Sequence, residues 1–290
     1  MKTVSVITPF YKGNEHMQGL FRSIQENALT CQPHDIQVEL VLVNDSPGVE
    51  MKIPQGQWDF QLTTLENAQN SGIHASRIHG LEVARGEYIL MLDQDDLLEP
   101  DGILSNMETL GEADAVLGNG YMKYPDRQEI IYRNRLYQSW INRLPVLLAY
   151  GDTVMSPGQC IIRKEAFPKG WLERPLKING ADDELLWVMM LLEGRRFAIN
   201  PKVVYWHMDT GHNTSYDFRQ MANSALEGCD TLREYTSITP AQMRTFVRRR
   251  KIKAARYKAS RGKKLLLALK NPDLSIMIIL VKLVKSWKGY

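Results

Sequence analysis

The sequence contains little cysteine, and the three cysteines lie far apart. Cys31, Cys160 and Cys229 are odd in number and show no metal-ligand spacing. This excludes a disulfide-stabilised secreted domain and a structural zinc site, and we expect reduced thiols in a cytoplasmic protein. The first residues enter a predicted strand at once, which leaves no room for a signal peptide.

Hydrophobic runs long enough to cross a bilayer are also lacking. The most apolar stretch near the C-terminus, residues 274–281, falls well short of the about 20 residues that a spanning helix needs. Lysines at 282, 285 and 288 share one side of the helix that continues it, while another side carries Met277, Leu280, Val284 and Trp287. This pattern is typical of a helix that lies in the plane of a membrane surface.

Acidic residues are absent from residues 244–270, which contain twelve Lys or Arg. Residues 271–290 add a net +2, so the chain's total of +3 leaves −11 for residues 1–243. A basic C-terminal segment on an acidic body needs an anionic partner. Nucleic acid fits poorly, because the segment has no ladder of interleaved aromatic side chains and the acidic body would repel it. We therefore expect residues 244–290 to bind an anionic membrane surface. The alternative is a helix that packs on the body or on a second subunit of a homodimer, with solvated arginines.

Strand and helix patterns alternate through most of the chain, which indicates an α/β fold with a parallel sheet. Strands are expected at 4–8, 38–43, 61–65, 88–92, 113–121, 158–162 and 197–206, and helices at 14–29, 73–84, 101–110 and 182–193. The sequence is helical and basic from residue 217 onwards.

Three carboxylates follow the predicted buried strand at 88–92. Asp93, Asp95 and Asp96 lie within four residues, at the end of a strand where open α/β sheets bind ligands. Such a concentration of negative charge is costly unless a cation answers it. A divalent metal that also carries phosphate oxygens would do so. The alternative is a solvated acidic turn in which Asp96 caps the following helix.

Five motifs together resemble the family 2 glycosyltransferases of the GT-A fold, which make bacterial surface polysaccharides. They are Val-Ile-Thr-Pro-Phe-Tyr at 6–11, Val-Asn-Asp-Ser at 43–46, Asn-Ser-Gly at 70–72 with Arg77, Leu-Asp-Gln-Asp-Asp at 92–96 and Ala-Asp-Asp-Glu-Leu-Leu at 181–186. The resemblance implies a Rossmann-like, mostly parallel central sheet flanked by helices. It would place the transferase domain at 1–216, with a nucleotide-binding half at 1–122 and an acceptor-binding half at 123–216. A helical, basic extension with an amphipathic membrane-surface helix would follow at 217–290.

The resemblance also implies roles for individual residues around the donor. Thr8 and Pro9 correspond to the edge of the nucleobase pocket, and Asp45 to the carboxylate that accepts from the base. Arg77 corresponds to the Arg that reaches the base or the phosphates, and Asp93 to the acid that binds the ribose. Asp95 corresponds to the ligand of Mn²⁺ or Mg²⁺. His207 is a second candidate ligand, and its alternative role is that of a core or hydrogen-bonding histidine.

The acceptor side is predicted in the same way. Asp183 resembles the catalytic base of the family, while Asp182 is a candidate acceptor or lid residue whose alternative role is to cap the helix. His212, Asn213 and Ser215 could close over the diphosphate as a lid, although a surface loop explains them as well.

The implied function is that of an inverting, metal-dependent hexosyl- or N-acetylhexosaminyltransferase. It would move a sugar from a nucleotide diphosphate donor, with UDP as the expected nucleotide, to a saccharide acceptor linked to polyprenyl diphosphate. Its expected location is the inner face of the cell membrane. The alternatives are a nucleotidyltransferase and a non-catalytic relative that binds nucleotide sugars. A nucleotidyltransferase would need a Gly-rich, basic loop after the first strand, where this sequence reads Pro-Phe-Tyr-Lys-Gly-Asn.

Overall fold

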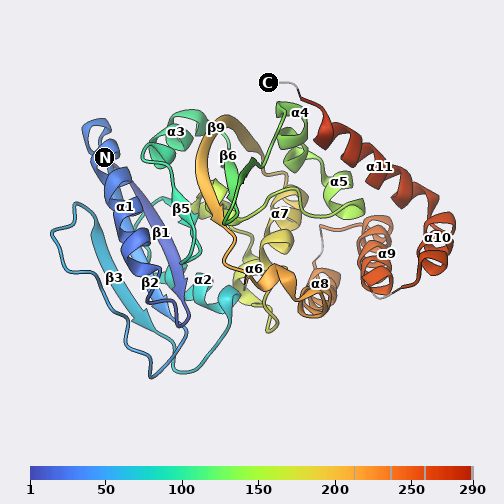
Figure 1. Ribbon diagram of the computed structural model, residues 1–290, viewed down its shortest axis with the longest axis horizontal. Helices are drawn as coiled ribbons and strands as arrows, with labels where there is room; N and C mark the ends of the chain where they lie inside the picture. Colours follow the sequence, from blue (N-terminus) through green and yellow to red (C-terminus); the bar gives the residue numbers. More distant parts are fainter. Residues whose placement is uncertain (212, 236, 258, 289–290) are drawn as a thin grey trace. The chain divides into compact units, whose positions relative to one another are not determined.

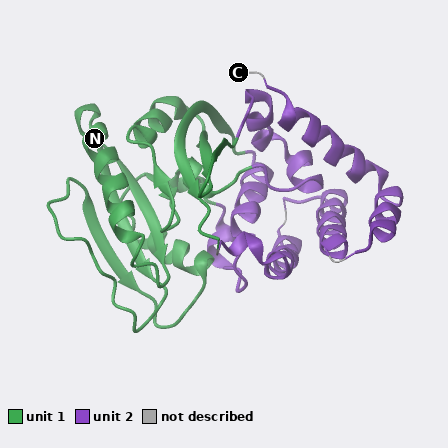
Figure 2. Ribbon diagram, in the orientation of Figure 1, with its two compact units in different colours: residues 1–131, 154–167, 195–211 green, residues 132–153, 168–194, 212–290 purple. Residues whose placement is uncertain are grey.

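The structure, a computed structural model, describes residues 1–211, 213–235, 237–257 and 259–288. The chain forms two compact units (Figure 2). Unit 1 consists of residues 1–131, 154–167 and 195–211, and unit 2 of residues 132–153, 168–194 and 212–290. These units are structural groupings, and the functional boundary expected at residue 216 stays a prediction.

Unit 1 is built on a mixed sheet whose strands run in the order β3-β2-β1-β4-β8-β6-β9-β5, with β7 paired to β6. Figure 1 shows β3, β2 and β1 side by side and β6 next to β9. The strands are β1 (Lys2–Phe10), β2 (Ile36–Asn44), β3 (Gln61–Glu66), β4 (Tyr88–Met91), β5 (Leu97–Leu98), β6 (Ala115–Lys123), β7 (Gln128–Ile130), β8 (Cys160–Arg163) and β9 (Phe197–Met208). The α/β class expected from the alternating patterns is confirmed.

The first half of this sheet is parallel, as the sequence predicts. Strands β3, β2, β1 and β4 all run in the same direction, and helices α1 (Met17–Cys31) and α2 (Ile73–Val83) lie in the crossovers. Strand β1 is buried from Val4 to Phe10, which is why its sequence reads as a continuous apolar run. Helix α2 packs so closely that a Cβ on Gly80 would lie 2.4 Å from Ile7. The carboxyl ends of β1, β2 and β4 therefore meet at one edge.

The second half departs from the parallel arrangement. Strand β8 runs antiparallel between β4 and β6, whereas β6 and β9 are parallel to each other. Helix α3 (Gly102–Leu110) packs on β6 and β9. The two-residue strand β5 pairs with β9 directly after the acidic motif. A strand of two residues is too short to show an alternation of apolar and polar side chains, so β5 could not be predicted from the sequence.

Unit 2 is helical in its described part. Its helices are α4 (Arg135–Gln138), α5 (Leu144–Ala149), α6 (Lys169–Glu173), α7 (Asp182–Leu192), α8 (Phe218–Arg233), α9 (Pro240–Tyr257), α10 (Arg261–Leu269) and α11 (Pro272–Ser286). Helix α7 is buried from Leu185 to Met190 and packs against α5, α6 and α8. An apolar run without an exposed face is what a central helix requires.

Part of the basic segment belongs to the interior of unit 2. Arg250 on α9 is only 2% exposed, and both Arg249 and Arg250 form ion pairs with the buried Glu184 of α7. These two arginines are therefore neither solvated nor available to a membrane, in contrast to the expectation for the whole segment. The remaining cations on α9 and α10 are largely exposed.

Helix α11 has two apolar stripes rather than one. Leu274 and Val281 are buried, and the side-chain amide of Asn134 donates hydrogen bonds to the carbonyls of Val284 and Trp287 at the end of α11. The other stripe is exposed and consists of Ile276, Ile279, Leu280, Leu283 and Trp287. The predicted stripe of Met277, Leu280, Val284 and Trp287 is thus wrong in its membership, because Met277 and Val284 turn partly inward. None of the described helices is both long and apolar enough to span a bilayer.

Candidate active site

The candidate donor site lies in unit 1, where the carboxyl ends of β1, β2 and β4 meet. Thr8 and Pro9 are buried near the end of β1. The Thr8 Oγ1 atom is buried and has no hydrogen-bond partner among the described residues. A buried hydroxyl without a partner costs free energy, so its presence here is compatible with a ligand that supplies the missing contact.

Asp45 follows β2 directly and organises the neighbouring loop. Its Oδ1 accepts from the Asn67 side chain at 2.8 Å and from the Ser71 N–H at 2.7 Å, and its Oδ2 accepts from the Gly72 N–H at 2.9 Å. Gly72 adopts φ +88°, a conformation that favours glycine. Because an ionised carboxylate offers about four acceptor sites, Asp45 can hold this loop and still accept from a base. Asn67, which the sequence analysis missed, also donates to Ser76.

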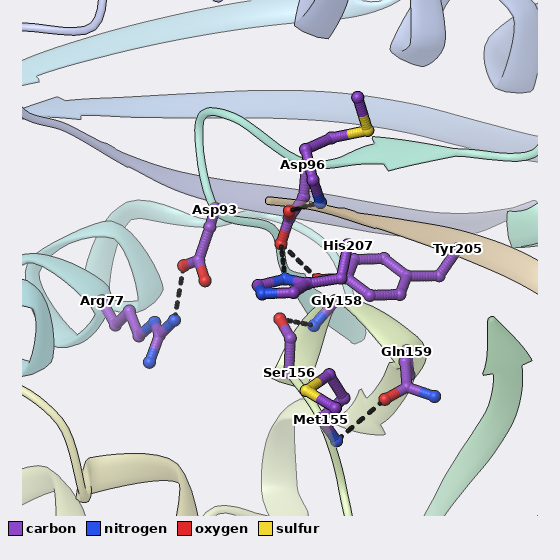
Figure 3. Close-up of polar contacts among 10 residues, drawn as sticks. Arg77, Asp93, Asp96, Met155, Ser156, Gly158, Gln159, Tyr205 and His207 are labelled. Atoms are coloured by element: carbon purple, nitrogen blue, oxygen red, sulfur yellow. Dashed lines mark hydrogen bonds and ion pairs between the residues drawn. The ribbon is translucent and has the colours of Figure 1, made fainter. Parts of the chain in front are cut away.

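Arg77 projects from α2 towards the acidic motif after β4. Its Nη2 lies 2.6 Å from Oδ1 of Asp93, and the Arg77 side chain is only 3% exposed (Figure 3). The predicted phosphate-binding and ribose-binding residues are thus brought together as an ion pair. Both groups carry the charge and hydrogen-bonding capacity that a nucleotide needs.

Asp95 is partly exposed beside this pair. Burial and the negative charges of Asp96 and Asp93 raise its pKa from 3.8 to about 7. A neutral or half-protonated carboxylate at this position signals unbalanced negative charge, which a bound cation would relieve.

Asp96 holds the end of β9 and does not cap a helix. It is fully buried and accepts hydrogen bonds from the Tyr205 hydroxyl and, at 2.9 Å, from the Met208 N–H. His207 Nδ1 lies 3.2 Å from Asp96 and 3.0 Å from the Tyr205 hydroxyl oxygen (Figure 3). The alternative in which Asp96 caps the following helix is therefore wrong, since α3 begins after Asp101. Sequence reasoning missed Tyr205, whose partner lies 109 residues away.

The protonation of His207 follows from its neighbours. Burial lowers its pKa, but the hydrogen bond to Asp96 and the nearby carboxylates outweigh burial and raise the pKa to about 9. A carboxylate that holds one imidazole nitrogen is the usual support of a metal-binding histidine. A metal on the other nitrogen, Nε2, would have to displace a proton.

The donor atoms present fit a divalent cation shared with a ligand. Among the described residues, no group of three or more His, Cys, Asp or Glu side chains is arranged to hold a metal alone. Mg²⁺ and similar ions are commonly held by one or two carboxylates together with substrate phosphates. Asp95, with its raised pKa, and His207 are the side chains that would hold such an ion.

Gln94 fixes the loop that follows β1. Its side-chain amide exchanges two hydrogen bonds with the backbone of Tyr11, at 2.9 and 3.1 Å. Gln94, between Asp93 and Asp95, thus connects the motif at 92–96 to the motif at 6–11. This role of Gln94 cannot be predicted from the sequence, because a hydrogen-bonded pair separated by 83 residues leaves no local signal.

The predicted base and its neighbours lie in unit 2, at the start of α7. Asp183 is partly exposed, and its Oδ1 accepts from the Glu184 N–H at 2.7 Å. Asp182 is buried, and its carbonyl accepts from the Trp171 indole at 2.8 Å. The helix begins after Ala181 without a side-chain cap, so the capping role weighed for Asp182 is wrong. Of the three acids, Asp183 is the one exposed enough to reach a substrate.

The predicted lid residues show less organisation. His212 lies outside the described residues. Asn213 precedes the short 3-10 helix Thr214–Tyr216, and Ser215 lies within this helix and is exposed. A role as a lid stays a prediction.

Comparison with known sequences identifies relatives over most of the chain. Residues 5–171 match the family model described as Glycosyl transferase family 2. An uncharacterized glycosyltransferase from Haemophilus influenzae is 22% identical over 250 residues, which is 84% of this chain and 80% of the relative. A Bacillus subtilis protein named as the teichuronic acid biosynthesis glycosyltransferase TuaG is 29% identical over 112 residues, which is 38% of this chain and 42% of the relative.

Two solved structures have a similar fold. S. aureus TarS 1-349 in complex with UDP-GlcNAc has a TM-score of 0.62 at 15% identity, covering 94% of this chain and 78% of that one. The mannosyltransferase PcManGT from Pyrobaculum calidifontis, in complex with GDP-Man and Mn²⁺, has a TM-score of 0.57 at 16% identity. The match covers 99% of this chain and 88% of that one.

Proposed function

The chain belongs to glycosyltransferase family 2 and has the GT-A fold, and on this premise we propose that it transfers a sugar, with inversion, from a UDP-sugar to a saccharide hydroxyl. The observation that carries the proposal is the acidic cluster after β4. Asp93, Asp95 and Asp96 bring three carboxylates together, and the positive charges of Arg77 and His207 balance them only in part. A divalent cation and a diphosphate would complete this balance.

Each donor-site residue has a role that its chemistry supports. Asp45 accepts from the N3–H of the base, Thr8 and Pro9 border the base, and Asp93 accepts from the ribose hydroxyls. Arg77 orients Asp93 and contributes positive charge towards the phosphates. Asp95 and His207 are the side chains that would hold Mn²⁺ or Mg²⁺. When bound, this ion neutralises the charge that develops on the leaving diphosphate.

Asp183 is the proposed general base that takes the proton from the acceptor hydroxyl. It is partly exposed at the first turn of α7, where the positive end of the helix favours the ionised carboxylate. An ionised carboxylate within hydrogen-bond reach of the hydroxyl is what this step requires. The adjacent Asp182 is buried and supports the turn through its backbone.

The proposed acceptor is a saccharide carried on a lipid diphosphate in a cell membrane, as part of surface-polysaccharide synthesis. The biosynthetic name of the TuaG relative supports this choice of pathway class. The exposed stripe of α11, together with Leu265, Leu266 and Leu269 on α10, supports attachment to a membrane surface.

A panel of nucleotide sugars tests the proposal. We expect one UDP-sugar, with Mn²⁺ or Mg²⁺, to raise the melting temperature and to be hydrolysed slowly without an acceptor. Asp93→Asn should weaken both effects, because it loses the charged partner of Arg77. If no nucleotide sugar in the panel stabilises the protein, the assignment of the donor site is wrong.

A further inference from the structure

A pocket of about 830 Å³ lies within unit 2, lined mainly by α9 with contributions from the end of α8 and from α10. Its volume is in the range that accommodates a drug-sized ligand. None of the donor-site or acid residues described above lines it. The pocket is therefore separate from the chemistry assigned to the acidic motifs.

The pocket combines apolar walls with basic residues. Met243, Val247, Ile252 and Leu267 supply apolar surface, and Arg233, Arg244, Arg248 and Lys251 supply positive charge. Arg244, Arg248 and Lys251 follow one another at spacings of four and three residues, so they share a face of α9. The inward arginines of the same helix, Arg249 and Arg250, are already paired with Glu184.

Part of the charge in this pocket has no acidic counterpart. Arg248 forms an ion pair with Asp273, and Arg233 with Asp230. Arg244 and Lys251 have no acidic partner in the described part of the chain. No aromatic side chain described here lines the pocket, so it lacks the stacking surfaces typical of nucleic-acid sites. Apolar walls and uncompensated cations together suit an anion that carries an apolar chain.

The surroundings indicate where such a molecule would come from. Leu267 lines the pocket, while Leu265, Leu266 and Leu269 on the same helix are 62%, 51% and 70% exposed. One helix thus contributes both to the pocket and to an apolar surface without a cover. We propose that this pocket binds the phosphate-bearing end of a single-chain membrane lipid. The inference deepens the proposed function and rests on it only for the idea that this lipid carries the acceptor.

Calorimetric titration of the full-length protein tests the pocket directly. The probe is farnesyl diphosphate below its micelle concentration, compared with farnesol and with inorganic diphosphate, all in EDTA so that no metal draws diphosphate to Asp95. We expect farnesyl diphosphate to bind at least about tenfold more tightly than either fragment, since it alone uses both the walls and the charges.

Matched variants locate the binding. The double variant Arg244→Gln with Lys251→Gln should bind farnesyl diphosphate about tenfold or more weakly than wild type. Val247→Trp should prevent binding, because the larger side chain fills the pocket. Lys263→Gln with Lys264→Gln removes two exposed charges from α10 outside the pocket and should change little. If Val247→Trp does not fold, as judged by circular dichroism, the charge variants decide.

Four results would overturn the proposal: no binding of farnesyl diphosphate, binding of diphosphate alone as tight as that of farnesyl diphosphate, binding of farnesol alone as tight as that of farnesyl diphosphate, or equal losses of binding in the pocket and control variants. The outcome is independent of the donor site. A protein that binds nucleotide sugars but not farnesyl diphosphate keeps its proposed function and loses the lipid pocket. Binding of farnesyl diphosphate without any donor binding would give the reverse result.

Discussion

Single carboxylates at the candidate site differ in role because their surroundings differ. Asp96 is fully buried and accepts hydrogen bonds from the Tyr205 hydroxyl and the Met208 N–H, so its role is to hold the end of β9 in place. Asp95 is partly exposed, and burial together with the charges of Asp96 and Asp93 raises its pKa to about 7, so a bound cation would relieve the crowding of charge there. Adjacent acids in one motif can therefore divide into a structural and a ligand-binding residue.

The structural role of Asp96 can be tested by removing the hydroxyl group of Tyr205. Tyr205→Phe removes the donor to buried Asp96, and we expect the free energy of unfolding to fall by about 1–3 kcal/mol. Urea denaturation of the two proteins measures the difference. Tyr121→Phe, on a residue that is partly exposed, is the control and should change stability little. Equal stabilities of Tyr205→Phe and wild type would contradict the assigned role.

Asp183 and Asp182 give the corresponding test for the base. Asp183→Asn keeps the shape but loses basicity, so turnover should fall about 10²-fold or more while donor binding is retained. Asp182→Asn should reduce the melting temperature more than the turnover, because Asp182 is buried. Steady-state kinetics with the identified donor separate the two. The reverse pattern would move the base to Asp182.

The sequence points to the residues of the motifs but not to their partners. Asp93 and Asp95 stand out at the end of a predicted strand, whereas the roles of Asp45 and Arg77 are implied by the family resemblance and stay predictions. The pairing of Asp96 with Tyr205 and the clamp of Gln94 on Tyr11 join positions far apart in the chain, so no local pattern reveals them.

At the scale of elements, helix α9 is joined to α7 by a buried charge cluster. Glu184 accepts from the Asp152 N–H at 3.0 Å and pairs with Arg249 at 2.8 Å and Arg250 at 3.1 Å. Burial raises the pKa of Glu184, but the charges of Arg250 and Arg249 outweigh it and lower the pKa from 4.5 to about 2. This contact between α9 and α7 could not be predicted from the sequence. In a run of basic residues, nothing in the sequence distinguishes a buried arginine from an exposed one.

The lowered pKa of Glu184 predicts how stability depends on pH. A carboxylate whose pKa is lower in the folded state stabilises that state above the unfolded pKa of about 4.5, and this stabilisation is lost as pH falls towards 2. Glu184→Gln should therefore lower the free energy of unfolding by about 3 kcal/mol near pH 7. The difference from wild type should shrink between pH 4.5 and 2. Denaturation at several pH values measures it, and a constant difference would contradict the account.

The whole molecule is expected to associate with membranes through α10 and α11. Removing residues 241–290 would be a poor test, because it would also leave Glu184 without Arg249 and Arg250. Ile279→Asp with Leu283→Asp keeps that cluster and charges the exposed stripe. We expect the full-length wild-type protein to sediment with anionic vesicles. The affinity of this variant for the vesicles should be lower by about tenfold or more.

The control for this experiment places the same charges on exposed apolar residues of unit 1. Leu29 is 49% and Val83 37% exposed, so Leu29→Asp with Val83→Asp should still sediment like wild type. Release of wild type in high salt would show the contribution of the basic residues. Equal sedimentation of the two double variants would exclude the α11 stripe as the membrane contact.

The whole-molecule architecture was predicted in outline. Alternating strands and helices gave the α/β class and the parallel strands β3, β2, β1 and β4, and the family comparison and fold comparison agree with GT-A. The antiparallel β8 and the grouping of residues 212–290 with 132–153 and 168–194 were not predicted. Both depend on contacts between distant segments, which periodicity does not encode.

Turnover of Asp95→Asn tests the central claim, a glycosyl transfer assisted by a metal at the end of β4. With the donor found in the panel and Mn²⁺ present, we predict a loss of about 10²-fold or more in turnover. Without ligands, the melting temperature of the variant should be unchanged or raised, because the substitution removes one of three crowded carboxylates. Wild type in EDTA should lose turnover similarly. Near wild-type turnover of Asp95→Asn in EDTA would contradict the account.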